Sequence, residues 1–124
     1  MRILVFRVGH KVELEDSSNP FNHAKELIGG GYVESLTLED GVVVYCDENG
    51  RHLGLPINRV IPARMPEFPS DMFVIDTRQD GGPPPGEMGV HRIYGNFLLT
   101  RHGEEDCIDL TDADIQKYSS IGMP

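Results

Sequence analysis

Basic residues are scarce in this chain. It has 11 Lys and Arg against 20 Asp and Glu among 124 residues, for a formal net charge of −9 at pH 7. Wrapping nucleic acid or lying on an anionic membrane requires Lys and Arg to neutralise phosphates. We therefore expect neither direct nucleic-acid binding nor a membrane partner. The excess of acids is typical of a solvated surface, and it also allows an acidic face to meet a basic partner.

Cysteines and long apolar segments are also few. The two cysteines, Cys46 and Cys107, lie in apolar runs and form no Cys-x-x-Cys pair. No apolar run approaches the length of a membrane span, and "MRILVFRVG" is too short and too soon followed by charge for a signal peptide. These features favour an intracellular compartment with reduced thiols.

The apolar content is sufficient for one core. Leu, Ile, Val and Phe number 34 of the 124 residues, well above the level of disordered chains. The length predicts a single domain, 1–124. Because small domains bury a lower fraction of their surface, a homo-oligomer would add stability.

The first third of the chain predicts two strands and a helix. Residues 2–8 are almost wholly apolar, which is typical of a strand covered on both faces. Residues 11–15 alternate apolar and charged residues and predict a half-buried strand. A helix at about 19–29 is predicted from Asn19 as cap, Pro20 at the first position and glycines at its end.

Residues 32–53 predict a three-stranded meander. Strands at 32–38 and 42–46 are separated by "EDG", and "ENG" at 48–50 is a strong signal for a type I′ hairpin turn leading to a third strand at His52. Pro56 would stop that strand, and "INR" at 57–59 would form a helical turn.

The remaining sequence predicts a proline- and glycine-rich insertion at about 64–90 that contains a strand at 72–76. A hairpin follows at 93–110 with its turn near Gly103. A second helix at 111–119 has a capping box formed by Thr111 and Asp114. The fold class is therefore α+β: a mostly antiparallel sheet built from hairpins, with two short helices.

Three segments carry a family resemblance: "LIGGGYVESLTLEDGVVVYCDENGRHLGLPINR", "IYGNFLL" and "DLTDADIQKY". Together they resemble the family named domain of unknown function 3846. Two departures are Asn96, where the family pattern has Thr, and the proline-rich insertion. The resemblance implies an accessory protein of a bacteriophage, plasmid or other mobile element, acting in the cytoplasm of the bacterial host, with counter-defence as a common role for such proteins.

No motif for catalysis or metal binding is recognisable. Zinc spacing, a Gly-x-Ser-x-Gly elbow, a calcium loop and a phosphate-binding glycine loop are all missing from the sequence. His102 and Cys107 flank one predicted hairpin, as Cys46 and His52 flank another, but exposed histidines and structural thiols explain both arrangements. We therefore predict no catalytic residues, no metal and no cofactor.

The segment "GLPINR" at 54–59 is the candidate for a small-molecule site. An arginine fork can hold phosphate or carboxylate and an aromatic ring can stack on a base, so the predicted ligand-binding residues are Asn58, Arg59, Arg64, Tyr45, Tyr94 and Asn96. The structural alternative is that Asn58 caps a turn and that Arg59 pairs with Asp47 or Glu48.

An acidic strip near the C-terminus is the second candidate; its residues are Glu104, Glu105, Asp106, Asp109, Asp112 and Asp114. The leading hypothesis is a non-enzymatic binding protein that sequesters a nucleotide-like signal molecule. The alternative is an acidic inhibitor that masks a nucleic-acid-binding or active site of a basic host defence protein. A small nucleotide hydrolase is a further alternative, against which the lack of an acid–base constellation argues.

Overall fold

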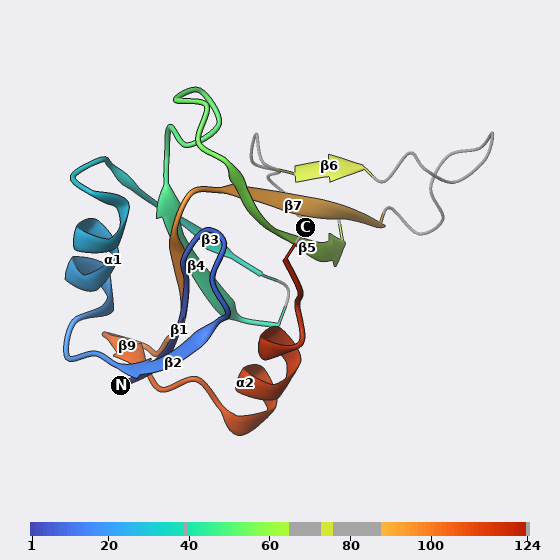
Figure 1. Cartoon of the computed structure of the whole chain (residues 1–124). Coiled ribbons are helices and arrows are strands. Elements are labelled where there is room, and N and C mark those ends of the chain that lie inside the picture. Colours follow the sequence, from blue (N-terminus) through green and yellow to red (C-terminus); the bar gives the residue numbers. More distant parts are fainter. Residues whose placement is uncertain (39, 65–72, 76–87, 124) are drawn as a thin grey trace.

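The computed structural model describes residues 1–38, 40–64, 73–75 and 88–123. Their elements form an α+β arrangement in which every described strand pair is antiparallel, as the sequence predicted (Figure 1). The strands are β1 (Arg2–Phe6), β2 (Glu13–Asp16), β3 (Val33–Thr37), β4 (Val42–Asp47), β5 (Ile57–Arg64), β6 (Phe73–Ile75), β7 (Met88–Tyr94), β8 (Phe97–His102) and β9 (Cys107–Ile108), and the helices are α1 (Pro20–Ile28) and α2 (Asp112–Ser119).

The main sheet has the strand order β2-β1-β8-β4-β3, with β9 also paired to β8. Strand β8 is central, since Leu99 lies opposite Leu4 of β1 and opposite Val44 of β4. Residues 3–6 of β1 are all buried. The prediction of a strand covered on both faces is confirmed.

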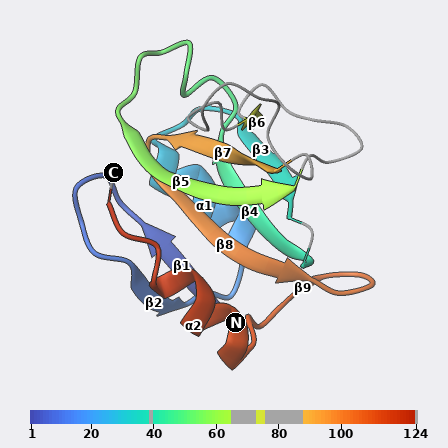
Figure 2. The ribbon, with the colours of Figure 1, turned by 90° about the vertical axis from the view of Figure 1, so that its right-hand side faces the viewer.

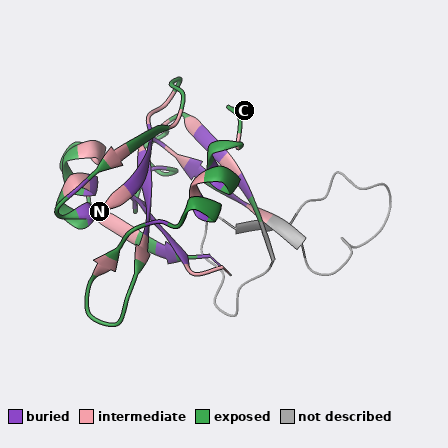
Figure 3. Cartoon of the chain, turned by 90° about the horizontal axis from the view of Figure 1, so that it is seen from below, coloured by how far each residue is buried: buried purple, intermediate pink, exposed green. Residues whose placement is uncertain are grey.

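The two faces of the main sheet are covered differently. Helix α1 packs on one face, where Ala24 meets Val5 and Leu98. The other face packs against the second sheet, of order β5-β7-β6, and against Tyr118 of α2. Figure 1 shows the helices on opposite sides of the sheet, Figure 2 shows β5 and β7 lying over it, and Figure 3 shows the buried residues between these layers. Each fully buried Leu, Ile or Phe contributes about 1.5–3 kcal/mol.

Both helices begin and end where local signals place them. The Asn19 side chain accepts a hydrogen bond from the Asn22 backbone N–H at 3.1 Å, and Pro20 occupies the first turn of α1. Gly29 ends α1 with φ of 80°, a conformation that costs glycine little. At α2, Thr111 and Asp114 form the predicted capping box. No helix in the described ranges is long and apolar enough to cross a membrane.

The predicted meander at 32–53 was wrong in its third strand. Residues 48–54 form turns, in which Leu53 N–H donates to the Asn49 carbonyl at 2.8 Å and Leu55 N–H to the Gly50 carbonyl at 3.0 Å. The physical reason is that β4 already has β3 and β8 as neighbours, so a third strand has no free edge there. The chain instead crosses to the second sheet.

The "INR" segment is a strand rather than the helical turn that was predicted. It begins β5, whose register with β7 shifts between Ile57 and Arg59. Strand β5 also contains Pro62, which is tolerated because β5 lies at the edge of its sheet and needs donors on one side only.

Other predicted elements differ from the structure in their burial or in where they begin and end. Leu14, predicted to lie in a half-buried strand, is 54% exposed, and it is Glu15 on the opposite face of β2 that is partly buried. Ile93, predicted to begin the last hairpin, belongs to β7. Of the insertion predicted at about 64–90, β6 and the start of β7 are ordinary strands. Its other residues, 65–72 and 76–87, lie outside the described residues.

Candidate functional site

Asn58 lies in the interior at the start of β5, only 1% exposed. Its amide Nδ2 donates to the carbonyl of Phe6 and to the carbonyl of Gly95, each at 2.9 Å. These two carbonyls belong to β1 and to the turn between β7 and β8. Asn58 therefore joins the second sheet to the main sheet, and its bond to Gly95 is a side-chain contact with a turn, as in the structural alternative.

Arg59 is also buried, with 2% of its surface exposed. Its guanidinium donates to the Asn58 carbonyl at 2.9 Å, to Asn58 Oδ1 at 2.7 Å and to the His10 carbonyl at 2.8 Å. Its Cζ lies 5.3 Å from the centre of the Phe6 ring. Burial lowers the pKa of Arg59, but an arginine keeps its charge.

The predicted ion pair of Arg59 with Asp47 or Glu48 was wrong. In the described part of the chain the guanidinium contacts neutral oxygens only, and the Asp47 carboxylate accepts the Asn49 backbone N–H at 2.9 Å instead. The cause is the extended course of β5, which directs Arg59 into the core under the β1–β2 loop. "GLPINR" is thus a structural connection between the two sheets.

Of the other predicted ligand residues, Asn96, Tyr94 and Tyr45 do not join Asn58 and Arg59 in one pocket. Asn96 binds the Val8 N–H at 2.9 Å and the Leu27 carbonyl at 3.3 Å. Tyr94 borders a cavity of about 220 Å³ beside residues 47–52. Tyr45 lies on the α1 face of the main sheet. The side chain of Arg64 lies outside the described residues.

The acidic strip divides into two groups. Asp114 forms two hydrogen bonds with Arg101, at 2.8 and 2.9 Å. Asp109 and Asp112 bind Arg2, through its backbone N–H and its guanidinium, each at 2.7 Å. Each of these three acids therefore has a hydrogen-bond partner within the protein.

The second group comprises Glu104, Glu105 and Asp106, in the turn between β8 and β9. All three are exposed, and none has an ion pair with another described residue. The turn is closed by a hydrogen bond from the Gly103 N–H to the Asp106 carbonyl at 2.7 Å. We call residues 103–106 the acidic turn.

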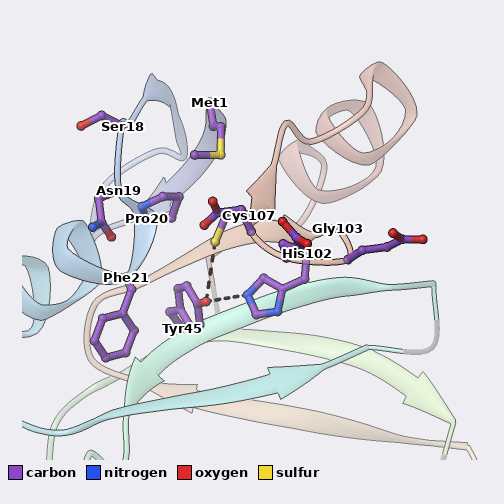
Figure 4. A pocket seen from close by; sticks show the side chains of 12 residues that line it. Met1, Ser18, Asn19, Pro20, Phe21, Tyr45, His102, Gly103 and Cys107 are labelled. Carbon is purple, nitrogen blue, oxygen red and sulfur yellow. Dashed lines mark hydrogen bonds between the residues drawn. The ribbon is translucent and has the colours of Figure 1, made fainter.

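A cavity of about 400 Å³ lies between the acidic turn and the start of α1 (Figure 4). Tyr45, His102 and Cys107 border it from β4, β8 and β9. The Tyr45 hydroxyl lies 2.5 Å from His102 Nε2 and 3.8 Å from Cys107 Sγ. The remaining lining residues are Met1, Ser18, Asn19, Pro20, Phe21 and the four residues of the acidic turn.

The Tyr45 ring is buried although its hydroxyl reaches the cavity. Tyr45 is 6% exposed, and the Phe21 ring packs edge-on against it at 5.9 Å between centroids. Burial, followed by the neighbouring Cys107 thiol, raises the pKa of Tyr45 above its usual value. The hydroxyl is therefore protonated at neutral pH and has a proton available for a hydrogen bond to His102 Nε2 or Cys107 Sγ.

This group could not be predicted from the sequence. His102 and Cys107 flank a predicted hairpin, and in the structure they lie directly opposite each other in the β8–β9 ladder. No local pattern connects Tyr45 of β4 with them, because it is 57 residues away from His102 in the chain. No group of three or more His, Cys, Asp or Glu side chains suited to hold a metal occurs in the described ranges.

Comparison with known proteins assigns the chain to a family. No curated protein and no solved structure matches the chain. A family model described as Domain of unknown function (DUF3846) matches residues 1–121, nearly the whole chain. The resemblance found in the three sequence segments is thereby confirmed, and the chain belongs to the DUF3846 family.

Proposed function

We propose that this protein is a non-enzymatic binding protein whose acidic turn covers a basic site on a partner protein. The observation that carries the proposal is the division of the acidic strip. Asp112 and Asp114 form ion pairs with Arg2 and Arg101, and Asp109 accepts the Arg2 backbone N–H. The three acids of the turn have no ion-pair partner among the described residues. Binding a cationic partner there breaks no internal ion pair.

The setting of the acidic turn supports this role. The turn is held at the end of a two-stranded ladder and closed by its own backbone hydrogen bond, so its backbone loses little conformational freedom on binding. The chain's net charge of −9 attracts a basic partner at long range and speeds association at low salt.

An exposed aromatic ring of α1 lines the cavity across from the acidic turn. Phe21 borders the same cavity as the acidic turn and is 46% exposed. Lys25 Nζ lies 5.8 Å from the centre of this ring, a distance at which a cation is attracted to an aromatic face. An arginine or lysine of the partner would find both a ring and carboxylates at this place.

The geometry supports this function better than sequestration of a nucleotide-like signal. Of the side chains expected to grip phosphate, those of Asn58 and Arg59 are buried and bind protein oxygens, and that of Arg64 lies outside the described residues. The 400 Å³ cavity is bordered by three carboxylates, which repel phosphate. The resemblance implied an accessory protein of a mobile element. We therefore propose that the partner is a host defence protein with a basic nucleic-acid-binding or active site.

The test compares two double variants of equal charge. Glu104→Gln/Glu105→Gln removes two charges from the acidic turn. Glu26→Gln/Glu48→Gln removes two charges from exposed positions elsewhere. Both variants and the wild type are titrated with an arginine-rich peptide by calorimetry at low and at physiological salt, and are then used to capture proteins from bacterial lysate.

We expect the turn variant alone to lose affinity for the peptide, by about tenfold at low salt, with a smaller loss at high salt. A basic nucleic-acid-binding protein should be captured by the wild type and the control variant but not by the turn variant. Equal losses in both double variants would show that only net charge matters and would contradict the proposal. A phosphorylated small molecule retained in native mass spectrometry would favour sequestration instead.

A further inference from the structure

The two cysteines occupy contrasting environments. Cys46 in β4 is fully buried, and burial, with Glu34 and Asp47 nearby, raises the pKa of its thiol to about 12. Cys107 in β9 is partly exposed and borders the 400 Å³ cavity. Because the thiolate is the reactive form and needs access, Cys46 is inert and Cys107 is the accessible thiol.

Two contacts connect Cys107 to His102 through the Tyr45 hydroxyl. Cys107 Sγ lies 3.8 Å from the Tyr45 hydroxyl, within range of a sulfur hydrogen bond, and the same hydroxyl lies 2.5 Å from His102 Nε2. With the ring proton of neutral His102 on Nδ1, Nε2 accepts the Tyr45 proton while the Tyr45 oxygen accepts the thiol proton. Figure 4 shows the side chains of Cys107 and His102 converging on the Tyr45 hydroxyl.

We propose that Cys107 is a nucleophilic thiol that undergoes exchange with small disulfides bearing a positive charge, and that Tyr45 and His102 activate it. This inference goes beyond the proposed function and does not depend on the identity of any protein partner. The site is built from three strands that meet only in the folded chain.

The reaction balances as a thiol–disulfide exchange. Cys107 passes its proton to the Tyr45 oxygen as Tyr45 passes its own to His102 Nε2, which leaves a thiolate and an imidazolium. The thiolate attacks one sulfur of the disulfide, so one S–S bond forms as the other breaks. The departing thiolate takes a proton from the His102 imidazolium, and the protein holds a mixed disulfide. The incoming disulfide is the only oxidant.

The charges around the cavity set the preference among disulfides. From the acidic turn, Glu104, Glu105 and Asp106 contribute three carboxylates. The ammonium group of Met1, which also borders the cavity, is paired with Asp16 at 2.5 Å. Residues 18–21 at the start of α1 carry no charge. A cationic disulfide is therefore attracted and an anionic one repelled.

The experiment measures adduct formation by intact-protein mass spectrometry with three disulfides of similar size. Cystamine is cationic, 2-hydroxyethyl disulfide is neutral and 3,3′-dithiodipropionate is anionic. We expect a single adduct on native protein, located on Cys107 by peptide mapping. Cystamine should react at least about tenfold faster than the anionic compound at low salt, and the difference should shrink as salt is added.

Variants separate activation from simple exposure. Cys107→Ser should abolish the adduct, and Tyr45→Phe should slow it by about tenfold at pH 7 because the path to His102 is lost. At pH 10, where the thiolate no longer needs activation, the rates of Tyr45→Phe and the wild type should converge. Tyr118→Phe, which removes a hydroxyl bonded to Asp40 on the other face, is the matched control and should react like the wild type.

Three results would overturn the proposal. The first is an adduct that forms on Cys46 as readily as on Cys107. The second is a Tyr45→Phe protein that folds normally, by its circular dichroism, and reacts at the wild-type rate at pH 7. The third is a rate order among the three disulfides that does not depend on their charge.

Discussion

Arg101 of β8 donates two hydrogen bonds to Asp114 of α2, from Nε to Oδ2 at 2.9 Å and from Nη2 to Oδ1 at 2.8 Å. The same carboxylate accepts the Thr111 backbone N–H at 2.9 Å and so completes the capping box. The Asp114 side chain therefore both caps the start of α2 and binds α2 to the main sheet. Paired hydrogen bonds of this kind are stronger than a single contact between point charges.

Replacing Asp114 should destabilise the protein more than replacing its neighbour Asp112. Asp114→Asn removes the charge from a buried pair, and we expect a loss of about 2–3 kcal/mol in the free energy of unfolding. Asp112 pairs with Arg2 on the surface, where its side chain is 93% exposed. Asp112→Asn should therefore cost less than about 1 kcal/mol. Urea denaturation at pH 7 measures both, and equal losses would contradict this assignment.

The contribution of Asp114 should also depend on pH. The hydrogen bonds from Arg101, assisted by those from Thr111, hold the pKa of Asp114 below its ordinary value. A lowered pKa in the folded state stabilises the protein above the pKa of the unfolded chain, about 3.9, and this stabilisation is lost as the pH falls further. The stability difference between wild type and Asp114→Asn should therefore shrink between pH 5 and pH 3 in the same denaturation assay. A stability difference that stays constant over this pH range would contradict the predicted contribution of Asp114.

Arg59→Ala should lower the denaturant concentration at which the protein unfolds, and it changes no exposed side chain. The substitution removes three hydrogen bonds, so their acceptor oxygens lose a donor and a void is left in the interior. We therefore expect a loss of about 2–4 kcal/mol in the free energy of unfolding. Arg92→Ala, at an exposed position in β7, is the matched control and should change stability by less than about 0.5 kcal/mol. If Arg59→Ala folded as stably as Arg92→Ala, the structural role of "GLPINR" would be refuted.

Gly50→Ala tests why a glycine follows Asn49. The sequence suggested a left-handed turn, but Gly50 is not among the described glycines with positive φ. A methyl group placed there would lie 2.8 Å from the Tyr94 carbonyl oxygen, and a backbone atom cannot move aside easily. We expect a loss of about 1–3 kcal/mol, measured by thermal unfolding. Gly122→Ala, which meets open space, should be close to neutral.

The elements that the sequence predicted well are those with local signals. Asn19 with Pro20, and Thr111 with Asp114, mark the helix starts within a few residues of chain. The apolar run at 2–8 marks a strand covered on both faces. The Asn49-Gly50 signal failed because a hairpin needs a free edge for its second strand, and β8 had taken the place beside β4.

The sequence by itself determined the α+β class, both helices with their caps, the family and the acidic character of the surface, because each of these follows from composition or from residues close together in the chain. Only the tertiary structure decided that Arg59 is buried, which acids remain unpaired, and that Tyr45 meets Cys107 across a separation of 62 residues. The physical reason is that such contacts depend on how the strands order themselves in the sheet. That order is set by packing of the whole core rather than by any local pattern.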